Sequence, residues 1–159
     1  MKKIIFTRPE DGGVSIVCPA PKSSIEQMVG SLTDEQYEAL VMERSIPENA
    51  INVREIEDTD FPTVDGFRDA WEDGGDKINI NLIKAKDINL GRLRQKRDSL
   101  LDTYDKLLAR AMEIGTEQEV DNLKTKKQQL RDATEPLKAL TNPTSIDEII
   151  QLTPSLDEY

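Results

Sequence analysis

The sequence predicts an α+β protein in which a small β-rich head is followed by an antiparallel α-helical hairpin. Short β-rich segments with glycine turns lie within the first 80 residues, and a stretch without proline runs from Leu82 to Ile114. A helix-start signal then follows Gly115 directly. We therefore expect a small α+β head at 1–80, a coiled-coil-like hairpin at 82–140, and a short C-terminal helix and tail at 141–159.

The predicted head contains four candidate strands. The segments 4–7 and 14–17 are β-rich and flank the sequence Asp11-Gly12-Gly13, which predicts a hairpin with a glycine loop. The segment 51–56 predicts a short edge strand. The segment 77–81 alternates polar and apolar residues, so it predicts a last strand after the turn at residues 73–76.

Two helix starts are visible in the same region. Thr33 and Gln36 have the spacing of a capping box, in which each side chain satisfies a free donor at the helix start. Asp65 could cap a short helix that continues through Trp71. In such a helix Phe67 and Trp71 share one face, because they are four residues apart. Core packing and a role as partner anchors remain the two interpretations for this aromatic pair.

The hairpin prediction depends on apolar residues that recur at alternating spacings of three and four. On the first helix, with Asn81 as the expected N-cap, they are Leu93, Leu100, Tyr104, Leu107, Ala111 and Ile114. On the second helix they are Val120, Leu123, Leu130 and Leu137. Arg97 fills the one missing position of the first series, and Lys127 and Thr134 lie at the polar gaps of the second. The connection is only Gly115 and a capping box that begins at Thr116, which forces the two helices antiparallel.

The composition argues against catalysis. The chain of 159 residues has no histidine, the commonest general base and metal ligand. Its single cysteine, Cys18, has no basic neighbour in sequence and is expected to be a small buried hydrophobe. We expect no catalytic residue, no cofactor and no metal. The sequence shows no signal-peptide core and no run of about 20 apolar residues, so we expect synthesis in the cytoplasm and no membrane partner.

The charge is distributed unevenly. The net charge is −10, and residues 34–76 hold fourteen acidic and three basic residues, a net charge of −11. Residues 84–97 hold six basic residues and one acidic residue, a net charge of +5. The densest part of this basic segment is the basic cluster, which we define as Arg92, Arg94, Lys96 and Arg97. Three interpretations remain open: a solvated helix face, docking onto the acidic region of this or a neighbouring chain, and nucleic-acid binding. The last is disfavoured by the negative surroundings and the absence of interleaved aromatic residues.

Several segments resemble small proteins of tailed phages. They are Phe67-Arg68-Asp69-Ala70-Trp71 with the following turn and strand, the helix that carries the basic cluster, Lys127-Gln128-Gln129-Leu130-Arg131-Asp132, and the ending from Thr144 to Pro154. Such proteins are often encoded among tail or tail-fibre genes, and the layout is similar to that of tail-fibre assembly chaperones.

The resemblance implies a viral, non-enzymatic protein that binds other phage structural proteins or itself, as a virion component or an assembly chaperone. No catalytic residues carry over from it. The alternative is a phage-encoded acidic inhibitor of a host enzyme or defence protein. Phe67, Trp71 and the basic cluster are the candidate partner-binding residues.

Overall fold

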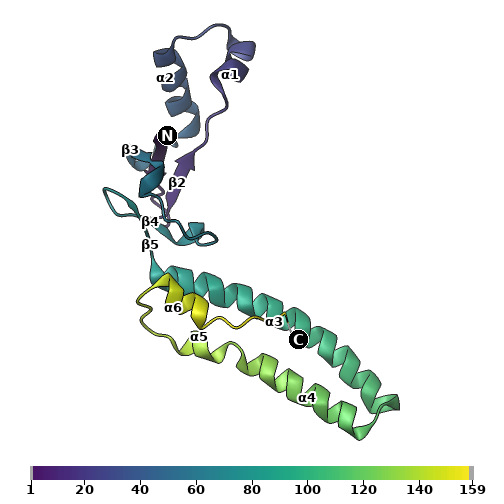
Figure 1. Ribbon diagram of the computed structural model, residues 1–159. Coiled ribbons are helices and arrows are strands. Elements are labelled where there is room, and N and C mark those ends of the chain that lie inside the picture. The colour runs from purple at the N-terminus through teal and green to yellow at the C-terminus, as the bar shows by residue number, and fades with distance from the viewer. Residues whose placement is uncertain (1, 158–159) are drawn as a thin grey trace. The chain divides into compact units, whose positions relative to one another are not determined.

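The computed structural model of the chain describes residues 2–157 and divides it into two compact units. Unit 1 is Met1–Asn81 and unit 2 is Leu82–Tyr159. Within the described residues, all strands lie in unit 1, whereas unit 2 consists of helices and their connections (Figure 1). The chain is therefore of the mixed α+β class, with the strands before the long helices, as the sequence predicted.

The sheet of unit 1 has three antiparallel strands in the order β2-β1-β3. They are β1 (Lys2–Thr7), β2 (Val14–Val17) and β3 (Ile51–Glu57). The predicted hairpin is thus confirmed, and the segment from Ile51 does form an edge strand. Because side chains alternate along a strand, the sheet presents two apolar faces.

The first face of the sheet packs on a second hairpin made of β4 (Trp71–Asp73) and β5 (Ile78–Ile80). Buried Ile5, Ile56 and Ile78 form this core, and Trp71 packs against it. The predicted glycine turn closes the hairpin, with Gly75 at φ 89°, a conformation that glycine adopts without strain.

The second face of the sheet packs on α2 (Asp34–Ser45), through Phe6, Val17 and Val41. The predicted capping box is present at its start. The Thr33 hydroxyl accepts from the Gln36 N–H at 3.2 Å, and the Gln36 side chain accepts from the Thr33 N–H at 2.9 Å.

The helix α1 (Lys22–Val29) was not predicted. It follows Pro21 directly, has no side-chain cap and buries none of its residues, so neither a capping signal nor a core pattern marks it in the sequence. Cys18, just before α1, is exposed, and the prediction that it is buried was wrong.

The short helix predicted between Asp65 and Trp71 is also wrong. Only a single 3₁₀ turn, η2 (Arg68–Ala70), forms there, and it has no side-chain cap. Trp71 instead begins β4, where it pairs with Ile80. Pairing with a neighbouring strand outweighs the weak helical signal here, because an aromatic residue packs well on a sheet surface. A second 3₁₀ turn, η1 (Asp58–Asp60), follows β3.

In unit 2, the first long helix covers the predicted residues 82–114, and the second begins after Thr116 as predicted. The helices of this unit are α3 (Leu82–Ile114), α4 (Glu117–Asp132), α5 (Glu135–Ala139) and α6 (Ile146–Gln151). The capping box at Thr116 is present, and Pro136 lies in the first turn of α5. The spacing of Ser145 and Glu148 predicts a third capping box, and at α6 it is altered: Ser145 caps the Glu148 N–H, but the Glu148 carboxylate accepts from Thr144. The Asn81 amide donates to Glu72 at 2.8 Å.

In unit 2, α3 and α4 lie side by side (Figure 1). Their shared core contains Leu93, Tyr104 and Leu130, and Leu156 of the C-terminal segment completes it. The Asn89 side chain also contacts this segment, donating to the Thr153 hydroxyl at 2.6 Å. The C-terminal segment therefore contributes to the core of unit 2 through Leu156. None of the described helices is both long and apolar enough to cross a membrane.

Candidate protein-binding groove

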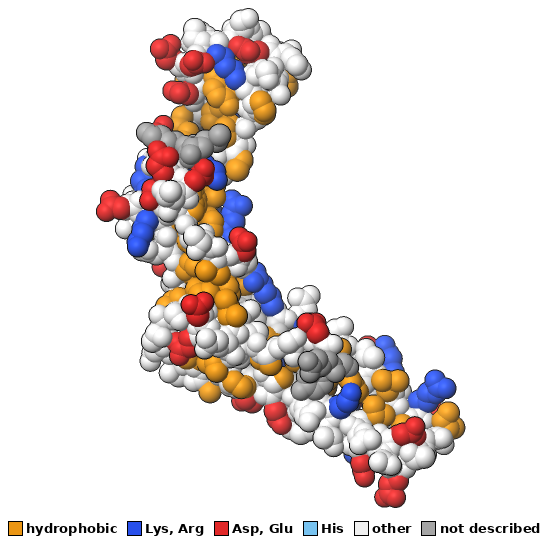
Figure 2. Space-filling view, in the orientation of Figure 1, with side chains coloured by type: hydrophobic (Ala, Val, Ile, Leu, Met, Phe, Trp, Pro, Cys, Tyr) orange, Lys and Arg blue, Asp and Glu red, His pale blue; other side chains and the backbone are white. Residues whose placement is uncertain are grey.

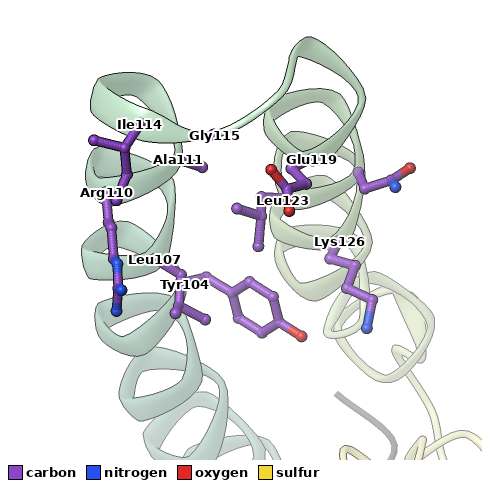
Figure 3. A pocket seen from close by; sticks show the side chains of 10 residues that line it. Tyr104, Leu107, Arg110, Ala111, Ile114, Gly115, Glu119, Leu123 and Lys126 are labelled. Carbon is purple, nitrogen blue, oxygen red and sulfur yellow. The ribbon is translucent and has the colours of Figure 1, made fainter.

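Unit 2 has a groove of about 670 Å³ between α3 and α4, beside their connection (Figure 3). We call it the turn groove. Its lining residues are Tyr104, Leu107, Arg110, Ala111, Ile114, Gly115, Glu119, Asn122, Leu123 and Lys126. Tyr104 and Leu123 point into the space between the helices, and Gly115 lies at the closing turn (Figure 3). This volume is within the range of small ligand and peptide sites, about 300–1,000 Å³.

The groove exists because the contact between α3 and α4 is not closed along its whole length. Leu130 is fully buried, but Leu107 is 47% exposed and Ile114 is 75% exposed. Ala111 offers only a methyl group at the position between them, which does not fill the space. Leu107 and Ile114 were predicted to form part of a closed seam, and their exposure shows that this prediction was wrong at the turn end.

Gly115 is required by a close approach of the chain. A Cβ atom at this position would lie 2.7 Å from the Ala111 carbonyl oxygen, much closer than real side chains come. Its N–H donates to the same carbonyl at 2.8 Å and ends α3. Glycine therefore permits the short connection that brings α4 back beside α3.

The charged side chains that line the turn groove are Arg110, Lys126 and Glu119, a net charge of +1. The Glu119 carboxylate accepts hydrogen bonds from the Thr116 N–H at 2.7 Å and the Thr116 hydroxyl at 3.1 Å. These bonds, the backbone one first, hold the pKa of Glu119 below its usual range. Arg110 and Lys126 are exposed, and the Lys126 ammonium lies 5.9 Å from the centre of the Tyr104 ring. An apolar floor with two cations on its rim suits an acidic amphipathic partner.

The candidate anchors Phe67 and Trp71 belong to unit 1 and pack within its core. Phe67 is only 4% exposed. The Trp71 ring is partly buried and lies 5.6 Å from the Phe61 ring, centre to centre. Of the two interpretations, this placement favours core packing, because neither ring stands out from the surface.

The basic cluster does not line the turn groove. Lys96 forms an ion pair with Asp157, and Arg97 bonds to Asp98 at 2.7 Å and to the buried Thr134 hydroxyl at 3.3 Å. Arg97 thus occupies the polar gap predicted for it between the two helices. Arg92 and Arg94 are exposed on α3.

Arg97→Ala is expected to lower the free energy of unfolding of unit 2 by about 1–2 kcal/mol, because buried Thr134 loses its charged donor. Arg94→Ala, on the exposed side of the same helix, is the matched control and should change it by less than about 0.5 kcal/mol. Urea unfolding followed by circular dichroism measures both. Equal effects of the two substitutions would show that the contact with Thr134 contributes nothing.

Lys127 lies at one of the two polar gaps predicted in the series of the second helix. It is 9% exposed and pairs with Asp105 of α3. The sequence identified this position as a gap but gave no partner for it, because Asp105 lies on the other helix. The groove residues Arg110 and Lys126 were not singled out from the sequence either, and the only signal was the small Ala111, one helical turn before Gly115.

Unit 1 has a small acidic hollow of about 290 Å³, lined by Glu55, Ile56, Glu57, Asp60 and Asp76. Within residues 2–157, no group of three or more acidic, histidine or cysteine side chains is arranged to hold a metal ion. The lining of the hollow is an acidic surface of unit 1.

Comparisons with protein-family models, with curated proteins and with solved structures find no match to this chain.

Proposed function

We propose that this chain is a non-enzymatic protein-binding protein of a tailed phage, either a virion component or an assembly chaperone of the tail or tail fibre. The observation that carries the binding function is the turn groove, with its exposed Leu107 and Ile114. The phage origin rests on the sequence resemblance alone. The protein is made in the host cytoplasm and acts on other phage structural proteins.

We propose that α3 and α4 act as an antiparallel helical hairpin that presents the turn groove. Its occupant is an amphipathic helix of a partner protein. Two adjacent helices that separate at one end leave a groove into which a third helix can lay its apolar face. Arg110 and Lys126 on the rim select acidic residues beside that face, because opposite charges set the orientation of the bound segment.

Leu107→Ser combined with Ile114→Ser is expected to reduce partner binding by about ten-fold or more, because it removes two apolar contacts. The thermal unfolding midpoint should change little, since both side chains are already exposed. Met112→Ser is the matched control: Met112 is 69% exposed on the same helix but does not line the groove. The measurement is binding to each purified tail protein of the encoding phage by calorimetry.

A photo-crosslinking residue in place of Leu107 tests the same site in infected cells. The crosslinker should capture one phage protein, and the crosslinked segment of that protein should be an acidic amphipathic helix. The same crosslinker in place of Met112 should not capture this protein. Equal capture from both positions contradicts the proposal. Mass spectrometry of purified virions then separates the two roles, because a virion component is present in the particle and a chaperone is absent.

The second candidate function is an acidic inhibitor of a host enzyme or defence protein. Residues 1–81 carry seventeen acidic and eight basic side chains, a net charge of −9. On the face shown in Figure 2, acidic side chains gather over the part of unit 1 that holds α1 and α2. Such a surface could cover a basic site. A pull-down from infected cells that recovers a host enzyme, inhibited by the purified chain, supports this alternative.

A further inference from the structure

We propose that the outer edge of β3 binds an extended, basic segment of another protein, which adds a fourth strand to the sheet beside α2. This site lies in unit 1 and is independent of the turn groove. The strand order β2-β1-β3 makes β3 the terminal strand, and within residues 2–157 no other strand pairs with its outer side. A terminal strand presents backbone donors and acceptors that an extended peptide can pair with.

The opposite edge of the sheet is less available. There, Gly13 beside β2 forms an isolated bridge with Glu72 of β4. On β3, by contrast, five of the seven side chains are exposed, including Ile51 at 48% and Val53 at 38%. Two exposed β-branched residues on an open edge are unusual for a protein that leaves this edge in solvent, because such an edge invites pairing.

A groove of about 390 Å³ runs beside this edge and supplies side-chain pockets. Its lining residues are Lys3, Ile4, Glu38, Met42, Val53, Arg54 and Glu55. Met42 of α2 is 41% exposed and, with Ile4 and Val53, makes the lining partly apolar. A strand added to β3 would direct every second side chain toward α2, so those side chains should be apolar.

The negative charge of unit 1 as a whole selects a basic occupant, since the groove lining itself holds two cations and two carboxylates. Both cations are already paired within unit 1: Lys3 with Asp58 at 2.8 Å, and Arg54 with Asp73 at 2.5 Å. The other charged lining residues are carboxylates, and unit 1 as a whole carries a net charge of −9. Lysine or arginine at the alternate, outward positions of the added strand therefore complements this surface.

A second copy of the chain fits this edge less well than a basic partner. Two unit 1 surfaces of net charge −9 repel each other. Antiparallel pairing of two β3 strands centred on Arg54 places the two arginines opposite each other, and a shift by one position does the same to Glu55. Like charges directly opposite destabilise a strand pair.

The β1–β3 register also limits how much of the edge is usable. The pairing shifts between Ile5 and Thr7, and Asn52 of β3 has a positive φ of 52°, so a bulge lies at this point. Bulges twist an edge strand away from regular pairing. The occupant therefore pairs with the regular part of β3, from Val53 to Glu57.

The test uses a labelled six-residue peptide of alternating valine and lysine, and fluorescence anisotropy with the full chain. Met42→Ser should weaken peptide binding by about ten-fold or more, since the bound peptide then loses its apolar contact with the methionine side chain. Met28→Ser is the matched control, because Met28 is 83% exposed on α1 and lies outside the groove. It should change the affinity less than about two-fold.

Backbone methylation distinguishes strand addition from simple charge attraction. An added strand directs only every second N–H toward β3. Two peptides are compared, one N-methylated on the valines and the other on the lysines. One of them should therefore lose binding, and the other should keep it. Equal binding of both peptides, or no effect of Met42→Ser, overturns the proposal. A third outcome also overturns it: the peptide does not bind, and the chain forms a dimer in ultracentrifugation that Met42→Ser dissociates. The occupant of the edge is then a second copy of the chain.

Discussion

Leu130→Asp should abolish the cooperative unfolding of unit 2 and remove most of its helical signal in circular dichroism. Leu130 is fully buried on α4, in the cluster that contains Leu93, Tyr104 and Leu156. The substitution deletes about 2–5 kcal/mol of packing and leaves a carboxylate in an apolar site. This exceeds the stability that a unit of this size usually has in reserve.

Leu107→Asp is the matched comparison for this substitution. Leu107 lies on the facing helix, α3, and belongs to the apolar series predicted to face that of Leu130. Its side chain, however, is 47% exposed in the turn groove. The sequence pattern alone predicts that both aspartates unfold the helices. From the structure we expect that only Leu130→Asp unfolds the helices, and that Leu107→Asp shifts the urea midpoint of unfolding slightly. Equal loss of helical signal would show that the groove closes in solution.

Asp73→Asn should lower the free energy of unfolding of unit 1 by about 2–3 kcal/mol at pH 7. The Asp73 side chain is 8% exposed and accepts from Arg54 at 2.5 Å and from the Thr7 hydroxyl at 3.3 Å. It also accepts from the Gly75 N–H at 3.0 Å. This carboxylate therefore ties β4 to both β1 and β3.

The effect of Asp73→Asn should depend on pH in a defined direction. Burial raises the pKa of Asp73, but the bonds from Arg54, Gly75 and Thr7 outweigh it and hold the pKa below its ordinary value of 3.8. The carboxylate thus stabilises the folded chain fully above pH 3.8, and this contribution is lost as the pH falls through the folded pKa. The difference between Asp73→Asn and the native chain should shrink below about pH 4.

Urea unfolding of unit 1 at pH 7 and at lower pH, followed by tryptophan fluorescence of Trp71, measures this difference. Asp65→Asn is the control, because Asp65 is exposed in the loop before η2. It should change the unfolding free energy by less than about 0.5 kcal/mol at every pH. A pH-independent difference for Asp73→Asn would mean that packing, not the ion pair, is what the substitution removes.

Local signals in the sequence were sufficient to place most elements. The capping boxes at Thr33 and Thr116 and the glycine at 115 act through atoms within a few residues of each other, so their residue types alone specify the helix ends. The same holds for the turns before β2 and β5. The helix α1 and the 3₁₀ turn before Trp71 were missed or misread, because neither carries a cap and the strand pairing of Trp71 depends on a partner nine residues away.

The candidate sites were less accessible to sequence reasoning. Periodicity identified which residues face the partner helix, but it treated Leu107 and Leu130 as equivalent. The burial of each depends on how far apart the two helices lie at that level, which side chains on both helices determine together. For the same reason, the exposed lining at Val53 and Met42 became visible only when β3 and α2 were placed beside each other.

The sequence by itself determined the α+β class, the first hairpin, the helix starts at Thr33 and Thr116 and the extent of α3. Tertiary structure alone decided that Phe67 is buried, that Arg97 is tied to Thr134, and that Leu107 is open to solvent. The physical reason is that caps, turns and periodicity are properties of neighbouring residues. Burial, ion pairing and grooves, in contrast, arise between side chains that the fold brings together from distant positions.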